Sequence, residues 1–283
     1  MSIFSRFSLL VFVGLTLPSG QGRAEQPVSP GSVEVSRLLE VTRIEPLVEI
    51  VATEGLVHGL ELEGALFPGR GGRAWQAEVS RIQTPVRMLP IIRAALNEML
   101  RPSESDAAIA FFSSDLGRRI VDREVAARRA MLDTQTESQA REASATLTAA
   151  TTPRALLIDE LIGALDLVDV NVSSGMNANF AFYRGLASGG NRTSAFNEGE
   201  TLATVRAQES EIRTQTVSWL RAFMMLAYAG LTDEDLQAYI RFSTSDVGRR
   251  YNAAMFQGFG TLFETTSYDL GRAAARFMVQ SDI

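Results

Sequence analysis

The feature that most constrains the fold is an internal repeat. The stretch "SSDLGRR" at residues 113–119 returns as "TSDVGRR" at residues 244–250. At the same shift, nine of the twenty residues in 100–119 are identical to their counterparts in 231–250. A repeat of this length indicates that one structural unit occurs twice in the chain. We therefore predict two diverged copies of a single unit.

Both copies have the hydrophobic periodicity of helices, and strand-like alternation is scarce. Thr84 and Pro85 are expected to be the cap and the first residue of one helix. The predicted fold class is all-α, made of two pseudo-repeated helical bundle units that pack through apolar stripes. The stripes consist of Trp75, Val79, Ile82, Val86, Leu89, Leu96 and Leu100 in the first copy, and of Leu202, Val205, Ile212, Trp219, Phe223 and Leu226 in the second.

The chain divides into three predicted segments. Residues 1–24 have the order of a secretory signal peptide: a basic residue at Arg6, an apolar run, and a small-residue break that ends at Ala24. The apolar run is too short to span a bilayer. We expect cleavage after Ala24, a first helical repeat at residues 25–150 and a second at residues 151–283. The prediction is a periplasmic or secreted protein with no membrane span after cleavage.

A capped helix is predicted to precede each repeated heptapeptide. In the second copy, the hydroxyl of Thr232 can cap a helix whose first residues are acidic and oppose the positive end of the helix dipole. In the first copy, Ser103 and Asp106 are expected to act in a similar way after Pro102.

The heptapeptide itself is predicted to be a turn between two helices. Its Ser, Thr and Asp side chains compete for local hydrogen bonds, so the chain should turn and restart there. Asp115 and Asp246 would lie in the first turn of the new helix, and Gly117 and Gly248 would allow a close approach of the two helices. The residues assigned to this structural motif are Phe111, Ser114, Asp115, Gly117, Phe242, Ser245, Asp246 and Gly248.

The arginines that end the motif have two interpretations. They either bridge to the acidic helix starts and brace the fold, or they bind an anion. We favour bracing, because a capping and packing motif is expected to recur with its fold. The candidate binding residues are Arg118, Arg119, Arg249 and Arg250. No catalytic residue is assigned.

The run "LTDEDLQAYIRFSTSDVGRRY" resembles the core of a family of exported bacterial proteins catalogued only as domain of unknown function 2059. Ser243 stands where the family pattern has Tyr, and Asp246 stands where it often has Pro. The first copy departs further from the pattern. The resemblance implies a helical, exported protein and brings no known activity. The matching positions are Leu231, Thr232, Glu234, Asp235, Leu236, Phe242, Thr244, Gly248 and Arg249.

Composition excludes several chemistries. The chain has no Cys, one His and no Lys, so all 27 basic residues are Arg. Schiff-base enzymes, phosphate-loop lysines and the common zinc sites cannot be built from it. Without Arg6 and Arg23, 25 arginines face 33 acidic residues, a balance that disfavours nucleic acid as a partner. No metal and no cofactor are predicted.

The favoured function is a non-catalytic binding or scaffolding module of the bacterial envelope, with an unknown protein or small-molecule partner. One alternative is a carrier of a small apolar ligand. Another is a hydrolase or lyase that uses carboxylates and Arg at the cleft between the repeats. Convergent carboxylates with an Arg in one pocket would favour the enzyme, and an apolar cavity would favour the carrier. The oligomeric state stays open.

Overall fold

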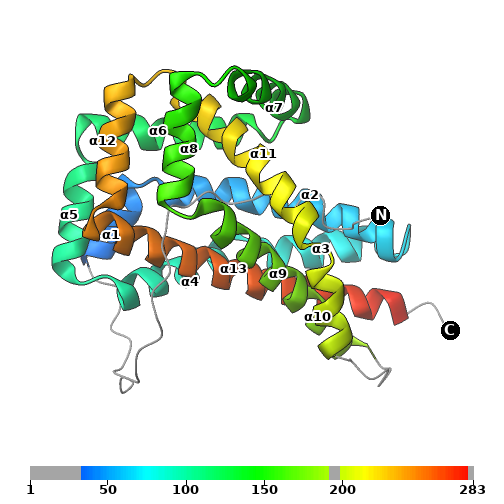
Figure 1. Ribbon diagram of the computed structural model, residues 1–283. Helices are drawn as coiled ribbons and strands as arrows, with labels where there is room; N and C mark the ends of the chain where they lie inside the picture. The colour runs from blue at the N-terminus through cyan, green and yellow to red at the C-terminus, as the bar shows by residue number, and fades with distance from the viewer. Residues whose placement is uncertain (1–32, 191–197, 280–283) are drawn as a thin grey trace.

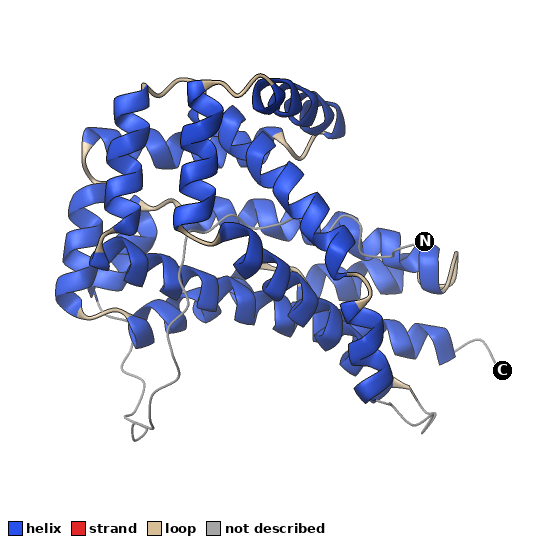
Figure 2. Cartoon of the chain, viewed as in Figure 1, coloured by secondary structure: helices blue, strands red, loops and turns tan. Residues whose placement is uncertain are grey.

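The computed structural model describes residues 33–190 and 198–279, so the predicted signal peptide at residues 1–24 lies outside the described part. The all-α prediction is confirmed: every regular element in the described ranges is a helix (Figure 2). The helices, labelled in Figure 1, are α1 (Val33–Val41), α2 (Ile44–Leu66), α3 (Gly72–Ile82), α4 (Pro85–Met99), α5 (Pro102–Phe112), α6 (Asp115–Ala130), α7 (Thr134–Ala149), α8 (Pro153–Ala164), α9 (Leu167–Gly189), α10 (Glu198–Arg206), α11 (Glu209–Tyr228), α12 (Asp233–Thr244) and α13 (Asp246–Val279).

Three hydrophobic clusters form the interior, and each combines helices from both predicted repeats. The first cluster joins α1, α2, α4 and α5 to residues 251–262 of α13. The second joins α6 to α8, α11 and α12. The third surrounds Trp75 and joins α2 and α3 to α9 and the end of α13. The boundary predicted near residue 150 falls in the turn between α7 and α8.

The last helix is the longest and runs along the whole molecule, with α9 and α4 packed against it (Figure 1). Glycines allow α9 and α13 to approach closely. A Cβ atom on Gly185 would lie 2.1 Å from the backbone oxygen of Tyr268, and one on Gly271 would lie 2.1 Å from that of Phe182. Side chains larger than hydrogen would force these two helices apart.

Two helix junctions have the same backbone geometry. A single residue in the left-handed region joins α1 to α2 and α8 to α9: Arg43 at φ 54° and Asp166 at φ 50°. The two junctions do not occupy equivalent positions of the predicted repeat, because Arg43 lies within the stretch 37–47, whereas Asp166 follows the similar stretch 155–165. The shared geometry therefore does not test the repeat, and repetition of the units remains a prediction.

Most predicted helix starts are observed. The helix α4 begins at Pro85 with Thr84 at the N-cap position. The helix α12 begins directly after Thr232, whose hydroxyl accepts a hydrogen bond from the Asp235 N–H at 3.1 Å. Thr232 therefore caps α12 through its side chain, whereas Thr84 makes no capping hydrogen bond and α4 starts with Pro85 as its first residue.

The cap predicted for the first copy was wrong. The helix α5 begins at Pro102, and its start is held by Glu104 rather than by Ser103. One Glu104 carboxylate oxygen accepts a hydrogen bond from the Arg101 N–H at 2.9 Å. The carboxylate of the third helical residue thus accepts from the N–H of the N-cap residue Arg101, a different backbone group from the one that a capping hydroxyl would serve.

The predicted apolar stripes contain three errors. Val86, Leu202 and Leu226 are exposed, whereas Trp75, Val79, Ile82, Leu96 and Trp219 are buried. The second stripe does not lie on one helix, because α10 ends at residue 206 and α11 begins at residue 209. The break changes the direction of the chain, so a periodicity read across it places Leu202 on the wrong face.

No helix in the described ranges combines the length and apolar character that a membrane span requires.

Candidate functional site

The two copies of the heptapeptide form two helix corners with the same hydrogen bonds. At the α5–α6 corner, the Ser114 hydroxyl accepts a hydrogen bond from the Gly117 N–H at 3.0 Å. At the α12–α13 corner, the Ser245 hydroxyl accepts one from the Gly248 N–H at 3.1 Å. A Cβ on Gly117 or Gly248 would lie 2.2 or 2.0 Å from a backbone oxygen of the preceding helix. Only glycine therefore fits at these two positions.

The corners meet at a pair of stacked rings. Phe111 and Phe242 have ring centroids 3.7 Å apart and an angle of 1° between their planes. Both rings are half-buried and pack against the first and second clusters. Asp115 and Asp246 are exposed and open α6 and α13, where the helix dipole favours a carboxylate.

The first arginine of each corner contacts the end of the helix before it. Arg118 donates a hydrogen bond to the backbone oxygen of Ser113, and the Arg249 Nε donates one to that of Thr244 at 2.7 Å. Carbonyl groups in the last turn of a helix have no partner within the helix, so these guanidinium groups supply one.

The second arginine of each corner crosses to the other corner. Arg119 forms two hydrogen bonds with Asp235, at 2.8 and 3.0 Å, and this interaction lowers the pKa of the Asp235 carboxyl. Arg250 lies 3.8 Å from Glu104. Asp235 and Glu104 each occupy the first turn of the helix that leads into the opposite corner. All four arginines thus have partners within the protein, and a role for them in binding an external anion remains a prediction.

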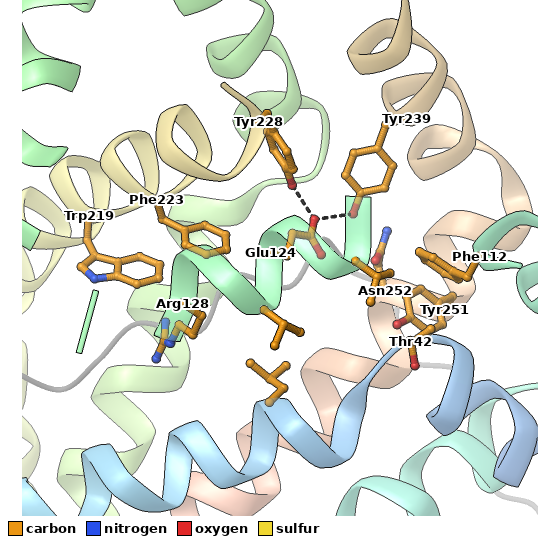
Figure 3. A pocket seen from close by; sticks show the side chains of 13 residues that line it. Thr42, Phe112, Glu124, Arg128, Trp219, Phe223, Tyr228, Tyr239, Tyr251 and Asn252 are labelled. Atoms are coloured by element: carbon orange, nitrogen blue, oxygen red, sulfur yellow. Dashed lines mark hydrogen bonds between the residues drawn. The ribbon is translucent and has the colours of Figure 1, made fainter. Parts of the chain in front are cut away.

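A small polar cavity lies between helices of the two predicted repeats (Figure 3). Its volume is about 50 Å³. Glu124 of α6 is half-buried and faces it. One oxygen of the Glu124 carboxylate accepts hydrogen bonds from the hydroxyls of Tyr228 at 2.5 Å and Tyr239 at 3.2 Å (Figure 3). The residues that line the cavity are Thr42, Leu47, Phe112, Val121, Glu124, Val125, Arg128, Trp219, Phe223, Tyr228, Tyr239, Tyr251 and Asn252.

The cavity changes the acidity of its polar groups. Desolvation raises the pKa of Glu124 to about 7, although the hydroxyls of Tyr228 and Tyr239 oppose the shift. Burial and the nearby Glu124 charge raise the pKa values of Tyr228 and Tyr239 well above their ordinary range. Glu124 is therefore the cavity group that changes its protonation near neutral pH.

A buried ion pair lies at one end of the cavity. Arg128 Nη2 is 2.7 Å from a carboxylate oxygen of Glu54 on α2, and the Arg128 side chain is 3% exposed. The guanidinium carbon also lies 4.6 Å from the centre of the Trp219 ring, an arrangement typical of a cation–π contact. The positive charge of Arg128 is therefore compensated without Glu124.

This cavity was not predicted, because no pair of carboxylates stands out in the sequence in an apolar setting that would separate their two pKa values. Glu124 lies between Ile120 and Met131 on the face of α6 that packs into the second cluster. A charged residue within an apolar helical stripe was the available signal. The tyrosine hydroxyls come from α11 and α12, and nothing in the sequence spacing links them to α6.

A surface groove of about 600 Å³ lies between α7 and α11. Its lining is mainly apolar, and small side chains of α7 face Val217 of α11 across it. The hydroxyl oxygen of Thr148 is buried there and has no hydrogen-bond partner within the described ranges. The groove is lined by Arg141, Ser144, Ala145, Thr148, Ala149, Arg213, Thr214, Val217, Ser218 and Arg221.

The three arginines of the groove are held in place by acidic residues. Arg141 contacts Glu137, Arg213 contacts Asp169, and Arg221 contacts Asp159. A guanidinium has five N–H donors, and these contacts leave some of them available. Arg221, for example, uses Nε and Nη2 for Asp159, at 2.8 and 3.1 Å, so Nη1 remains.

The single histidine lies away from these sites. His58 of α2 is buried, and burial lowers its pKa to about 4, so it is neutral at neutral pH. Across residues 33–190 and 198–279, no group of three or more His, Cys, Asp or Glu side chains is placed to hold a metal ion.

Fold and site together define an all-α protein with two linked helix corners, a small polar cavity and an apolar surface groove. The family described as "Uncharacterized protein conserved in bacteria (DUF2059)" matches residues 86–146. The chain resembles this family over that segment, which includes the first corner. No curated protein and no solved structure matches the chain. The similar run at residues 231–250 lies outside the match, so a second copy of the family unit remains a prediction.

Proposed function

We propose that the protein is an exported, non-catalytic binding module of the bacterial envelope, and that it binds a single-chain amphiphile with an anionic head in the α7–α11 groove. The main observation that supports this proposal is the groove volume of about 600 Å³. Small-molecule sites in proteins commonly measure roughly 300 to 1,000 Å³ and have mainly apolar linings. The groove has both properties.

The lining favours an amphiphile over a purely apolar ligand. Ala145, Ala149 and Val217 offer apolar surface for a hydrocarbon chain. Arg213 and Arg221 retain N–H donors that can bind a carboxylate or phosphate, because planar guanidinium groups match the geometry of such anions. The proposed function joins two classes that were alternatives at the level of sequence: a binding module and a carrier of a small ligand.

The enzyme remains the second candidate, and Glu124 is the observation that favours it. A carboxyl group with a pKa of about 7 beside Tyr228, Tyr239 and Arg128 is suited to acid–base chemistry. The cavity of about 50 Å³ is much smaller than the pockets that hold organic substrates. A hydrolase or lyase would therefore need a different conformation, whereas the groove accepts a ligand as it is.

Export is proposed from the sequence. Residues 1–24 have the charged, apolar and small-residue order of a signal peptide. The match to a bacterial family at residues 86–146 supports a bacterial setting. Mass spectrometry of the protein recovered from the periplasm of an expressing bacterium tests this point. A mature N-terminus at residue 25 is expected, and recovery of the uncleaved chain from the cytoplasm would contradict export.

Ligand binding can be tested by calorimetry with decanoate, and with decanol as a ligand of similar length without the charge. We expect saturable, stoichiometric binding of decanoate and at least tenfold weaker binding of decanol. Val217→Trp should fill the groove and abolish binding. Val86→Trp, at a position that is 81% exposed on α4, is the matched control and should bind normally. Equal binding of decanoate by both variants would contradict the groove as the binding site.

A further inference from the structure

The central cavity contains polar atoms that the protein leaves without partners. Both tyrosine hydroxyls contact the same Glu124 oxygen, Oε1 (Figure 3). The other oxygen, Oε2, has no hydrogen-bond partner in the part of the chain that the structure describes. Glu124 is half-buried and Oε2 is not a fully buried atom, so Oε2 faces the space of the cavity. An occupant of the cavity can donate a hydrogen bond to it.

A second polar group opens into the same cavity from α13. Asn252 is 4% exposed and lines the cavity next to Tyr239 and Tyr251 (Figure 3). Its side-chain amide forms no hydrogen bond with any residue in the described ranges. The amide atoms of Asn252 are not fully buried, so they face the cavity and are available to an occupant. Its amide oxygen can accept a hydrogen bond from the same occupant that Glu124 would hold.

The charged side chains that line the cavity indicate that its occupant carries a positive charge. Glu124 and Arg128 are the charged side chains that line the cavity. Arg128 is paired with Glu54 at 2.7 Å, so these two charges compensate each other. An ionised Glu124 then leaves one negative charge without a counter-ion. A small cation in the cavity would supply it.

The walls indicate what kind of cation fits. Six aromatic rings line the cavity, and aromatic faces attract organic ammonium ions. In the described ranges no cluster of three or more acidic or histidine side chains is present, whereas Ca²⁺ and transition metals need several such ligands. The aromatic residues are Phe112, Trp219, Phe223, Tyr228, Tyr239 and Tyr251.

Size limits the ligand further. The volume of about 50 Å³ is several times the roughly 10 to 15 Å³ that one water molecule needs, and it is too small for a sugar or an amino acid. We propose that the cavity is a binding site for a small protonated amine, whose N–H groups bond to Glu124 Oε2 and Asn252 Oδ1 within the aromatic walls. The site is separate from the α7–α11 groove and does not depend on the function proposed for it.

Methylammonium is the probe for this site, and methanol is its neutral counterpart of similar size. Thermal unfolding is followed as methylammonium chloride is added, with sodium chloride at the same ionic strength as the reference. A ligand that binds the folded state stabilises it in proportion to RT ln(1 + [L]/Kd). We expect a saturable rise of Tm with methylammonium only. Saturation-transfer NMR from the aromatic protons to the ligand methyl group should report contact with the walls.

Glu124→Gln removes the charge and keeps the shape of the side chain. We expect it to fold, to lose the methylammonium response at least tenfold, and to bind decanoate as the wild type does. Glu160→Gln, at an exposed position on α8, is the matched control and should respond as the wild type does.

Three results would overturn the proposal: no response beyond that of sodium chloride, an equal response to methanol, or an unchanged response in Glu124→Gln. None of these results would bear on the function proposed for the groove, because decanoate binding is measured separately.

Discussion

The helix corners and the central cavity differ in whether their polar groups have hydrogen-bond partners within the protein. At the corners, Ser114 and Ser245 cap backbone groups, and each motif arginine contacts a carbonyl or a carboxylate. A few residues away, the cavity leaves one oxygen of Glu124 and the amide of Asn252 without a partner. Satisfied polar groups stabilise a fold, and unsatisfied ones require a ligand or another explanation. The difference separates residues that hold the structure from residues available for binding.

The two corners also differ from each other, although their sequences are nearly the same. Arg119 makes a bidentate contact with Asp235, whereas Arg250 stays 3.8 Å from Glu104. Glu104 already pairs with Arg101 at 2.5 Å. The heptapeptide therefore determines the cap and the close approach of the helices, and the preceding helix determines how strongly the crossing arginine is held.

The largest expected effect concerns the cavity and its pH dependence. The folded state keeps the Glu124 proton up to a pH of about 7, whereas the unfolded state releases it near the ordinary pKa of 4.5. The unfolded state thus binds fewer protons between these values, and stability is lost as the pH rises through this window. The loss should be about 3 kcal/mol.

Urea unfolding of the wild type and Glu124→Gln from pH 4.5 to pH 8 measures this effect. The stability of the wild type relative to the variant should fall as the pH rises. His58, whose pKa is lowered to about 4, has the opposite slope and cancels in the difference. Parallel stability curves would mean that Glu124 does not titrate in this range.

Next in size is the effect of the corner glycines. Gly117→Ala and Gly248→Ala each bring a Cβ against a backbone oxygen that cannot move freely, so each should cost about 1 to 3 kcal/mol. Gly163→Ala on α8 is the control, because nothing lies within 4 Å of its added Cβ. It should be neutral or stabilising by up to about 1 kcal/mol, since Ala favours helix. Denaturant midpoints measure the stability of all three variants. An equal loss of stability in Gly163→Ala would contradict the steric explanation.

The serine caps should contribute less to stability than the corner glycines do. Ser114→Ala and Ser245→Ala each remove an acceptor for the N–H of a corner glycine and should cost about 1 kcal/mol. Ser210→Ala, at an exposed position in α11, should change stability little. Similar losses at both corners would support their equivalence. A loss at only one of them would show that the shared geometry does not bring shared energetics.

The smallest effect distinguishes the two corners. A double-mutant cycle with Arg119→Gln and Asp235→Asn should give a coupling energy of up to about 1 kcal/mol, because both side chains keep some solvent contact. The corresponding cycle with Arg250→Gln and Glu104→Gln should give a smaller value, since the atoms are 3.8 Å apart. A larger coupling at the second corner would contradict the geometric ranking.

Local signals in the sequence predicted much of the fold. Helical periodicity gave the fold class, and Thr84, Pro85 and Thr232 marked helix starts that the structure contains. Burial was harder to predict: Val86 lies in a predicted stripe but is 81% exposed. Whether a helix face is covered depends on helices that are distant in the sequence, and local periodicity carries no information about them.

The candidate site was the least predictable part. Glu124, Tyr228 and Asn252 come from three helices, and they become neighbours only when the chain is folded. Corner residues such as Ser114 and Gly117 lie three positions apart, so their interaction can be inferred from spacing alone. The sequence analysis therefore recognised the corners and overlooked the cavity.

The sharing of the first cluster with α13 has a consequence for biosynthesis. The side chains that complete this cluster, including Tyr251 and Phe259, follow α1, α2, α4 and α5 by a long stretch of the chain. The amino-terminal helices pack partly on one another, but they cannot complete the cluster until residues 251–262 have been made. Contacts between such distant parts of a chain also form slowly. The newly made polypeptide therefore closes its first hydrophobic cluster late in synthesis.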